Sequence, residues 1–230
     1  MTGSTDCRRC PRSRRRDLVE TAVAYGLILL VVWTPRPWQR ILWLVAAAAI
    51  IFFTCISLDT LQSMGLRRAN FLRSLWVAGV ALAVSGLAIA LAAHLHTLRL
   101  RGGPLWIVRH YWAYALWAAV QQFLLQCFFL ARLRRVLPSA GAAVLAAAGI
   151  FALAHLPNPI LTSITFVWGL VACVHFLRYR NLYPLILAHA IFGITVSLAI
   201  PGPVVHNMRV GLGYLTYTST QHSSYSAQPQ

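Results

Sequence analysis

Seven apolar blocks constrain the fold of this chain more than any other feature of its sequence. Each is close to the ~20 residues that a helix needs to cross a hydrocarbon core of ~30 Å. Hydrophobic residues make up 59% of the chain, and they come in continuous blocks, whereas barrel strands alternate with period two over about ten residues. The sequence therefore predicts an all-α integral membrane protein, a polytopic bundle of about seven transmembrane helices: Leu18 to Trp33, Ile41 to Leu58, Leu75 to Leu95, Tyr111 to Leu130, Ala140 to Leu156, Ile160 to Leu177 and Leu182 to Ile200.

The charge of the chain, a formal net +16, supports a membrane topology. Its basic residues are all arginines, and they lie between the spans, against four acidic residues: Asp6, Asp17, Glu20 and Asp59. With the amino terminus in the cytoplasm, most arginines fall on the cytoplasmic side, as the positive-inside rule requires. We therefore expect a multi-pass protein of a bacterial inner or plasma membrane in contact with anionic lipid. We expect no nucleic-acid partner, because no recognised motif accompanies the charge.

The composition divides the chain into three parts. Residues 1–17 form a basic cytoplasmic tail, residues 18–200 the transmembrane domain, and residues 201–230 a polar carboxyl-terminal tail. Within that last part, His206 and Asn207 follow Pro201 and Pro203 and could fold back over the outer mouth of the bundle.

Polar side chains interrupt the most apolar half of the chain. None of them is acidic, because the sequence has no aspartate or glutamate after Asp59. They lie on three predicted spans: Gln121, Gln122 and Gln126 on the fourth, His155 on the fifth and His189 on the seventh. Each is costly inside a bilayer and so suggests a function. A single membrane glutamine or histidine is more often a hydrogen-bonded packing residue. Because they occur together, we predict one shared site in the bundle interior.

One feature opposes a shared site. In the predicted topology His155 lies near the outer end of its helix, and His189 lies about seven residues from the inner end of its own. At ~1.5 Å per residue that separation closes only if the helices tilt or the boundaries of the fifth span are wrong.

The segment from Trp117 to Gly193 resembles the CAAX prenyl endopeptidase and bacteriocin-processing family of intramembrane proteases, also called Abi or type II CAAX protease-like. The family pattern is a glutamate pair followed by arginine, then Phe-x-x-x-His, then His-x-x-x-Asn. Phe151 and His155 keep the second motif, and His189 begins the third. The other motif positions are substituted: Gln121 and Gln122 stand for the glutamates, Gln126 for the arginine and Gly193 for the asparagine. The resemblance implies a CAAX-protease-like core at about residues 111–200.

The resemblance also implies peptide-bond hydrolysis, in which a motif glutamate activates water while the histidines and asparagine position it and stabilise the oxyanion. It makes Gln121, Gln122, His155 and His189 the catalytic positions, and Gln126, Phe151 and Gly193 the substrate-binding ones. A glutamine amide keeps the shape of glutamate but cannot take a proton from water near neutral pH.

Three replacements for the missing base are open. His155 or His189 could act as the base while the other polarises the carbonyl. The two histidines could instead hold a divalent metal such as zinc, although amide oxygen is a poor third ligand. Glu20 or Asp59 could reach the site, although an interfacial or capping role fits their positions near span ends better.

The sequence thus predicts a membrane-embedded endopeptidase that cleaves a lipidated or membrane-associated peptide, with altered or lost catalysis. The alternative is a catalytically inactive family member that binds a peptide, lipid tail or partner in the same cavity.

Overall fold

The computed structural model describes residues 13–57, 62–100 and 102–218, and within these ranges the only regular secondary structure is helical. The long helices are α1 (Arg14–Trp33), α2 (Trp38–Cys55), α4 (Trp76–His94), α5 (Pro104–Gln122), α7 (Ala140–Leu153), α8 (Pro159–Tyr179) and α9 (Tyr183–Ala199). Shorter ones are α3 (Phe71–Ser74), the π-helix η1 (Phe123–Leu130), α6 (Ala131–Val136), α10 (Gly202–Val205), the 3-10 helix η2 (His206–Met208) and α11 (Leu212–Leu215).

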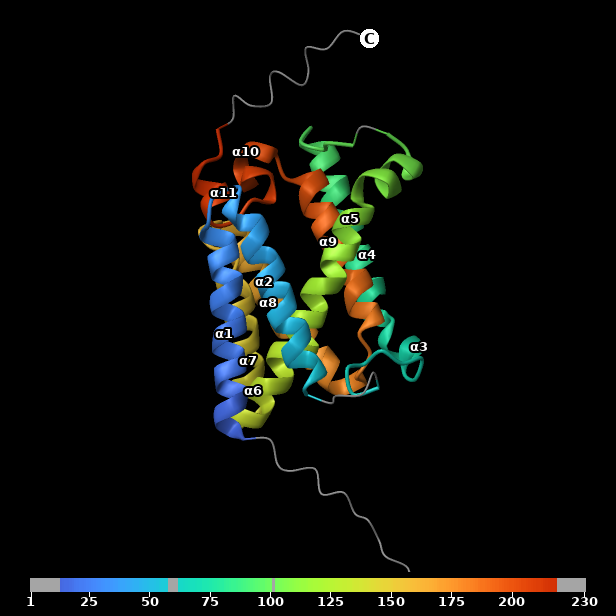
Figure 1. The fold of residues 1–230 in the computed structure, drawn as a ribbon. Helices are drawn as coiled ribbons and strands as arrows, with labels where there is room; N and C mark the ends of the chain where they lie inside the picture. The colour runs from blue at the N-terminus through green and yellow to red at the C-terminus, as the bar shows by residue number, and fades with distance from the viewer. Residues whose placement is uncertain (1–12, 58–61, 101, 219–230) are drawn as a thin grey trace, which may run out of the picture.

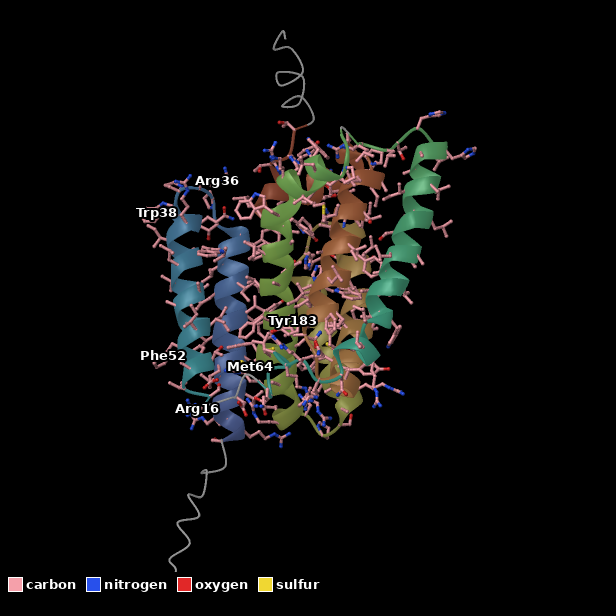
Figure 2. The ribbon with its side chains drawn as sticks, turned by 90° about the vertical axis from the view of Figure 1, so that its right-hand side faces the viewer. Arg16, Arg36, Trp38, Phe52, Met64 and Tyr183 are labelled. Atoms are coloured by element: carbon pink, nitrogen blue, oxygen red, sulfur yellow. The ribbon has the colours of Figure 1, made fainter. Side chains whose placement is uncertain are left out.

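The long helices run side by side and pack in pairs. Helix α7 packs on α8, α4 on α9 and α1 on α2, while α5 packs on α9 (Figure 1). The start of α1 and helix α6 lie at one end of the bundle, here called the basic end, and α10 and α11 lie at the other, here called the capped end. Figure 2 shows α1 and α2 on one flank and α4 on the opposite flank, with Trp38 and Phe52 of α2 pointing away from the bundle.

The prediction of a polytopic helical membrane protein is confirmed. Four helical stretches of the described chain are long and apolar enough to cross a membrane: Trp38–Cys55, Phe71–His94, Pro104–Val136 and Pro159–Tyr179. Helices α7 and α9 are apolar but shorter. Large apolar side chains such as Leu82 and Leu87 are 60% and 73% exposed on the bundle surface, which suits a surface that faces lipid rather than water.

Helix α5 continues through η1 into α6, which makes a single rod from Pro104 to Val136. A π-turn closes with i→i+5 hydrogen bonds in place of i→i+4, and such turns occur often at functional sites. Because the wider turn holds more residues, it changes which face each following side chain occupies. The π segment begins immediately after Gln121 and Gln122.

Two acidic residues of α1 hold this helix to α6 at the basic end. Glu20 accepts hydrogen bonds from Arg16 at 2.8 Å and from Arg132 at 2.9 Å. Asp17 accepts two from Arg135, at 2.8 and 2.9 Å. Both carboxylates are buried, so each is stabilised by its ion pair. Glu20 therefore has a structural role at the end of the bundle and does not line the candidate site, and Asp59 lies outside the described residues.

The structure corrects several boundaries. Helix α1 begins at Arg14, inside the segment predicted as a tail, α2 runs from Trp38 to Cys55 instead of Ile41 to Leu58, α5 begins at Pro104 instead of Tyr111, and α7 ends at Leu153 instead of Leu156. Residues 202–215, in the segment predicted as a polar tail, are largely helical and cover the capped end. Asn158 fixes this cover: its amide donates to Val205 O at 2.9 Å and to Arg209 O at 3.1 Å, and its carbonyl accepts from the first turn of α8.

Candidate functional site

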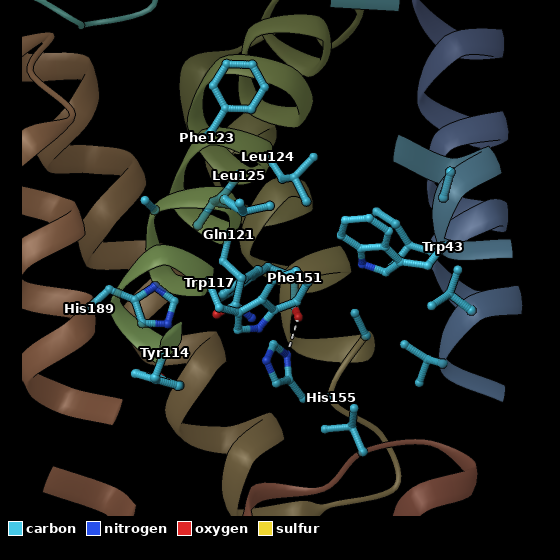
Figure 3. A pocket seen from close by; sticks show the side chains of 18 of the residues that line it. Trp43, Tyr114, Trp117, Gln121, Phe123, Leu124, Leu125, Phe151, His155 and His189 are labelled. Atoms are coloured by element: carbon cyan, nitrogen blue, oxygen red, sulfur yellow. Dashed lines mark hydrogen bonds between the residues drawn. The ribbon is translucent and has the colours of Figure 1, made fainter. Parts of the chain in front are cut away.

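A cavity of about 1550 Å³ lies between the α1–α2 pair and the rest of the bundle. Its walls come from α1, α2, α5, η1, α7, α8 and α9, and residues 207–210 lie at the capped end. Figure 3 shows His189 and Tyr114 on one wall, Trp43 on the facing wall, and His155 and Phe151 between them. The walls are largely apolar, and their polar residues include the predicted Gln121, His155 and His189.

His189 is buried on the cavity wall, about one third of the way along α9. Gln122 Nε2 lies 2.8 Å from His189 Nδ1. An amide nitrogen donates and does not accept, so His189 Nδ1 is the acceptor. In the neutral ring the proton is therefore on Nε2. Gln122 thus fixes the tautomer in which the Nε2–H of His189 can donate a hydrogen bond.

Gln122 and Gln126 lie behind His189 and do not line the cavity. Both are fully buried, and Gln126 Nε2 donates to Gln122 Oε1 at 3.3 Å. Gln126, predicted to contact substrate, therefore lies within the bundle, one turn after Gln122 and on the same side of the helix. The amide pair orients His189 from behind.

His155 follows the end of α7 and lines the same cavity. Its Nδ1 lies 2.7 Å from the carbonyl oxygen of Phe151, the contact drawn as a dashed line in Figure 3. A carbonyl oxygen only accepts, so His155 Nδ1 carries the proton and Nε2 of the neutral ring has a free lone pair. The two histidines thus have opposite tautomers: Nε2 of His155 can accept a proton, and Nε2 of His189 can donate one.

The two imidazoles meet despite the difference in depth expected from the sequence. The ring of Phe151 contacts both, with centroid distances of 5.1 Å to His155 and 6.0 Å to His189. Helix α7 has 14 residues, which rise only about 21 Å, less than a hydrocarbon core of ~30 Å. His155, just past its end, therefore still lies inside the bundle.

Helix α9 also begins inside the bundle. Tyr183, its first residue, lies farther from the basic end than Arg16 does in Figure 2. The segment before α4 folds under this start: Leu182 N–H donates to Gly65 O at 3.0 Å, and Asn181 donates to Arg67 O at 2.8 Å. This support lifts His189 toward the middle of the bundle.

The remaining predicted residues, Gln121 and Gly193, also line the cavity. Gln121 is half-buried on the last turn of α5, where its amide can hydrogen-bond a water or a peptide but cannot take a proton. Gly193 lies one turn after His189, and the phenol of Tyr114 packs directly on it. A Cβ at position 193 would overlap the Tyr114 hydroxyl oxygen.

Tyr114 and Trp168 were missed from the sequence, whereas Asn207 was expected, with His206, to fold back over the outer mouth. Trp168 of α8 packs edge-on against His189 at 6.0 Å. Asn207 lines the cavity at the capped end, whereas His206 turns away and stacks on Tyr214. One signal for Tyr114 was available: it precedes Gln121 by seven residues, two turns of helix, and so shares its face.

The donor set does not fit a resident metal. Catalytic zinc takes three protein ligands, and the described part of the chain has no group of three or more His, Cys, Asp or Glu side chains placed to hold an ion. Three imidazoles line the cavity, those of His110, His155 and His189, but they form no such group, and in His155 and His189 the Nδ1 is already used by a protein group.

Comparison with known proteins agrees with the motifs. Residues 104–195 match the model of one family, described as Type II CAAX prenyl endopeptidase Rce1-like. No curated protein and no solved structure matches the chain. The matched segment runs from the start of α5 into α9 and includes all seven predicted site residues. The family match thereby confirms the resemblance read from the motifs: residues 104–195 of this chain are similar to the type II CAAX prenyl endopeptidase Rce1-like family.

Proposed function

We propose that this protein is a membrane-embedded endopeptidase that cleaves a lipidated or membrane-associated peptide, with His155 as the base in place of the motif glutamates. The observation that carries the proposal is the opposite protonation of two histidines in one cavity. A base and a hydrogen-bond donor that converge on one cavity are the minimum for addition of water to a carbonyl.

The proton transfers follow from these tautomers. His155 Nε2 takes a proton from water as the water oxygen bonds to the peptide carbonyl carbon. The backbone carbonyl of Phe151 holds the Nδ1–H of the resulting imidazolium. The Nε2–H of His189 faces the negative carbonyl oxygen. When the C–N bond breaks, His155 returns its proton to the leaving amine, which yields a carboxylic acid and a free amine.

The cavity supports a lipid-bearing substrate. Its volume of about 1550 Å³ exceeds the ~300–1,000 Å³ of sites that bind small molecules. Aromatic and aliphatic side chains such as Trp43, Leu44 and Trp117 line it, and they are suited to an acyl or isoprenoid chain or to apolar peptide side chains. Membrane lipid is the expected competitor for this space.

An inactive binding protein is the second candidate. It is favoured by the glutamine at position 121, where the family has a glutamate, and by the lack of a carboxylate among the described residues that line the cavity. In that case the two histidines orient a peptide carbonyl without turnover.

Both candidates place the basic end in the cytoplasm. Arg14, Arg16, Arg132 and Arg135 cluster at that end, and positive charge is retained on the cytoplasmic side of bacterial inner membranes. A reporter domain fused at residue 218 should then be active outside the cytoplasm, and activity inside would contradict this orientation.

A fluorogenic farnesylated peptide, offered to purified protein in lipid nanodiscs, tests the proposal. His155→Gln should lower turnover by about 10²–10⁴-fold, as loss of a general base does. His94→Gln is the matched control, because His94 is exposed and lies outside the cavity. Equal turnover of His155→Gln and the control would refute the mechanism. If the native protein binds the peptide without cleaving it, and Gln121→Glu/Gln122→Glu gains turnover, the binding candidate replaces it.

A further inference from the structure

The hydroxyl of Tyr114 occupies the site from which the family asparagine would project. Tyr114 comes from α5 and Gly193 from α9, two helices that pack together. The Tyr114 hydroxyl oxygen and ring atoms Cζ and Cε1 are the atoms nearest to a Cβ built on Gly193. Position 193 cannot carry a side chain while this phenol is in place.

Both residues line the cavity beside the histidine pair. Gly193 follows His189 by four residues, one turn, so position 193 and His189 share a face of α9. A hydroxyl at this place lies on the same wall as the Nε2–H of His189 (Figure 3). Tyrosine and asparagine are chemically unlike, but each can donate one hydrogen bond to an oxygen.

We propose that Tyr114 is a catalytic residue of this chain: its phenol donates a hydrogen bond to the substrate carbonyl oxygen, in place of the family asparagine. The inference rests on the proposed function, because it needs an oxyanion to bind. Tyr114 and Gly193 are then a matched pair. Glycine makes room for the phenol, and the phenol replaces the donor that glycine lacks.

Two donors on one wall make the arrangement an oxyanion site. His189 supplies one N–H, fixed by Gln122, and Tyr114 supplies an O–H that can rotate about its C–O bond. Removal of one such donor lowers catalysis by about 10²–10³-fold in enzymes where it has been measured. A ring that merely fills space would instead affect all ligands alike, since its hydroxyl adds nothing specific to a tetrahedral oxygen.

The experiment compares ligands with and without a tetrahedral anionic centre. The probes are a positional series of farnesylated peptides in which one peptide bond at a time is replaced by a phosphinate, together with the amide parent. Affinities are measured in nanodiscs for the native protein, for Tyr114→Phe and for Tyr183→Phe, a control tyrosine that is exposed on α9 outside the cavity. We expect Tyr114→Phe to bind the preferred phosphinate about tenfold to a hundredfold more weakly, with amide affinity unchanged.

The outcomes separate this inference from the proposed function. If the native protein prefers no phosphinate over the amide, the proposed function fails and the inference fails with it. If it has a preference that Tyr114→Phe keeps, or if Tyr114→Phe loses both ligands equally, only the role of Tyr114 is overturned. Equal weakening by Tyr183→Phe would also overturn it.

An exchange of the pair supplies an independent test. Gly193→Asn alone should lower the melting temperature, since its side chain collides with Tyr114. Tyr114→Ala/Gly193→Asn should recover that temperature and the preference for the phosphinate, because the asparagine amide then supplies the donor. A Gly193→Asn protein as stable as the native one would refute the geometry on which the inference rests.

Discussion

The hydrogen bond between Gln122 and His189 determines the tautomer of His189, and therefore its role as the hydrogen-bond donor of the proposed mechanism. The strength of this bond can be measured. Gln122→Met keeps the length of the side chain but removes both amide groups. His189→Phe removes the imidazole acceptor. The coupling free energy between the two substitutions, taken from a double-mutant cycle, reports the bond itself.

The structure sets the expected magnitude. Interhelical hydrogen bonds in membrane proteins contribute about 0.6 kcal/mol on average and about 1.7 at most. The Gln122–His189 bond is 2.8 Å long, with 0% and 6% of the two residues exposed, so we expect a coupling in the upper half of that range, about 1–1.7 kcal/mol. Gln122→Met also loses the weaker 3.3 Å bond from Gln126, so alone it should cost about 2 kcal/mol.

The assay is reversible unfolding in mixed micelles of increasing SDS fraction, followed by tryptophan fluorescence, for the four proteins of the cycle. A parallel cycle with Ser139→Ala is the control, because the Ser139 hydroxyl caps α7 through Ala142 N and shares no hydrogen-bond partner with His189. Its coupling to His189→Phe should stay below about 0.5 kcal/mol, the usual limit for residues without a shared contact. A Gln122–His189 coupling no larger than this control would show that the bond does not form, and the tautomer assigned to His189 would fall with it.

Three further predictions concern the tautomers, the ion pairs and the cover. Solid-state ¹⁵N spectra of histidine-labelled protein should show His155 protonated on Nδ1 and His189 on Nε2, assigned by removing each in turn; the same tautomer for both would contradict the mechanism. Glu20→Gln should lower the free energy of unfolding by about 3 kcal/mol, because it removes the buried ion pair between Glu20 and Arg132, and a cost below about 1 kcal/mol would mean that water reaches the pair. Asn158→Ala removes the cap of α8 and both hydrogen bonds to the segment 202–215. Limited proteolysis should therefore cut that segment faster than in the native protein, and loss of the cap should destabilise α8 by about 1 kcal/mol. Unchanged cleavage would show that other contacts hold the segment in place.

The apolar blocks could be read as helices because hydrophobicity and length are local properties. Every block expected to span the membrane overlaps one of the long helices. Boundaries were less certain, because they depend on contacts between segments. Helix α1 begins early, where Asp17 and Glu20 find arginines of the long rod 104–136, and α7 ends early, before the turn held by Asn158.

The candidate site was predictable as a set of residues but not as an arrangement. Order and spacing identified Phe151, His155 and His189, because motif residues keep their separation along the chain. The burial of Gln122 and Gln126 behind His189 was not predictable, because it depends on how the rod 104–136 packs against α9. Tyr114 was missed because its relation to Gly193 joins two helices 79 positions apart in the sequence.

The sequence by itself determined that this is a polytopic helical membrane protein with a segment similar to a protease family, and that glutamines stand where that family has its glutamate base. Only the tertiary structure decided which histidine can accept a proton. An imidazole has two nitrogens of nearly equal basicity, and its tautomer depends on the hydrogen bond made by the other nitrogen. For His155 that partner is a carbonyl of its own helix, and for His189 it is an amide from a neighbouring helix, a contact that exists only once the bundle has formed.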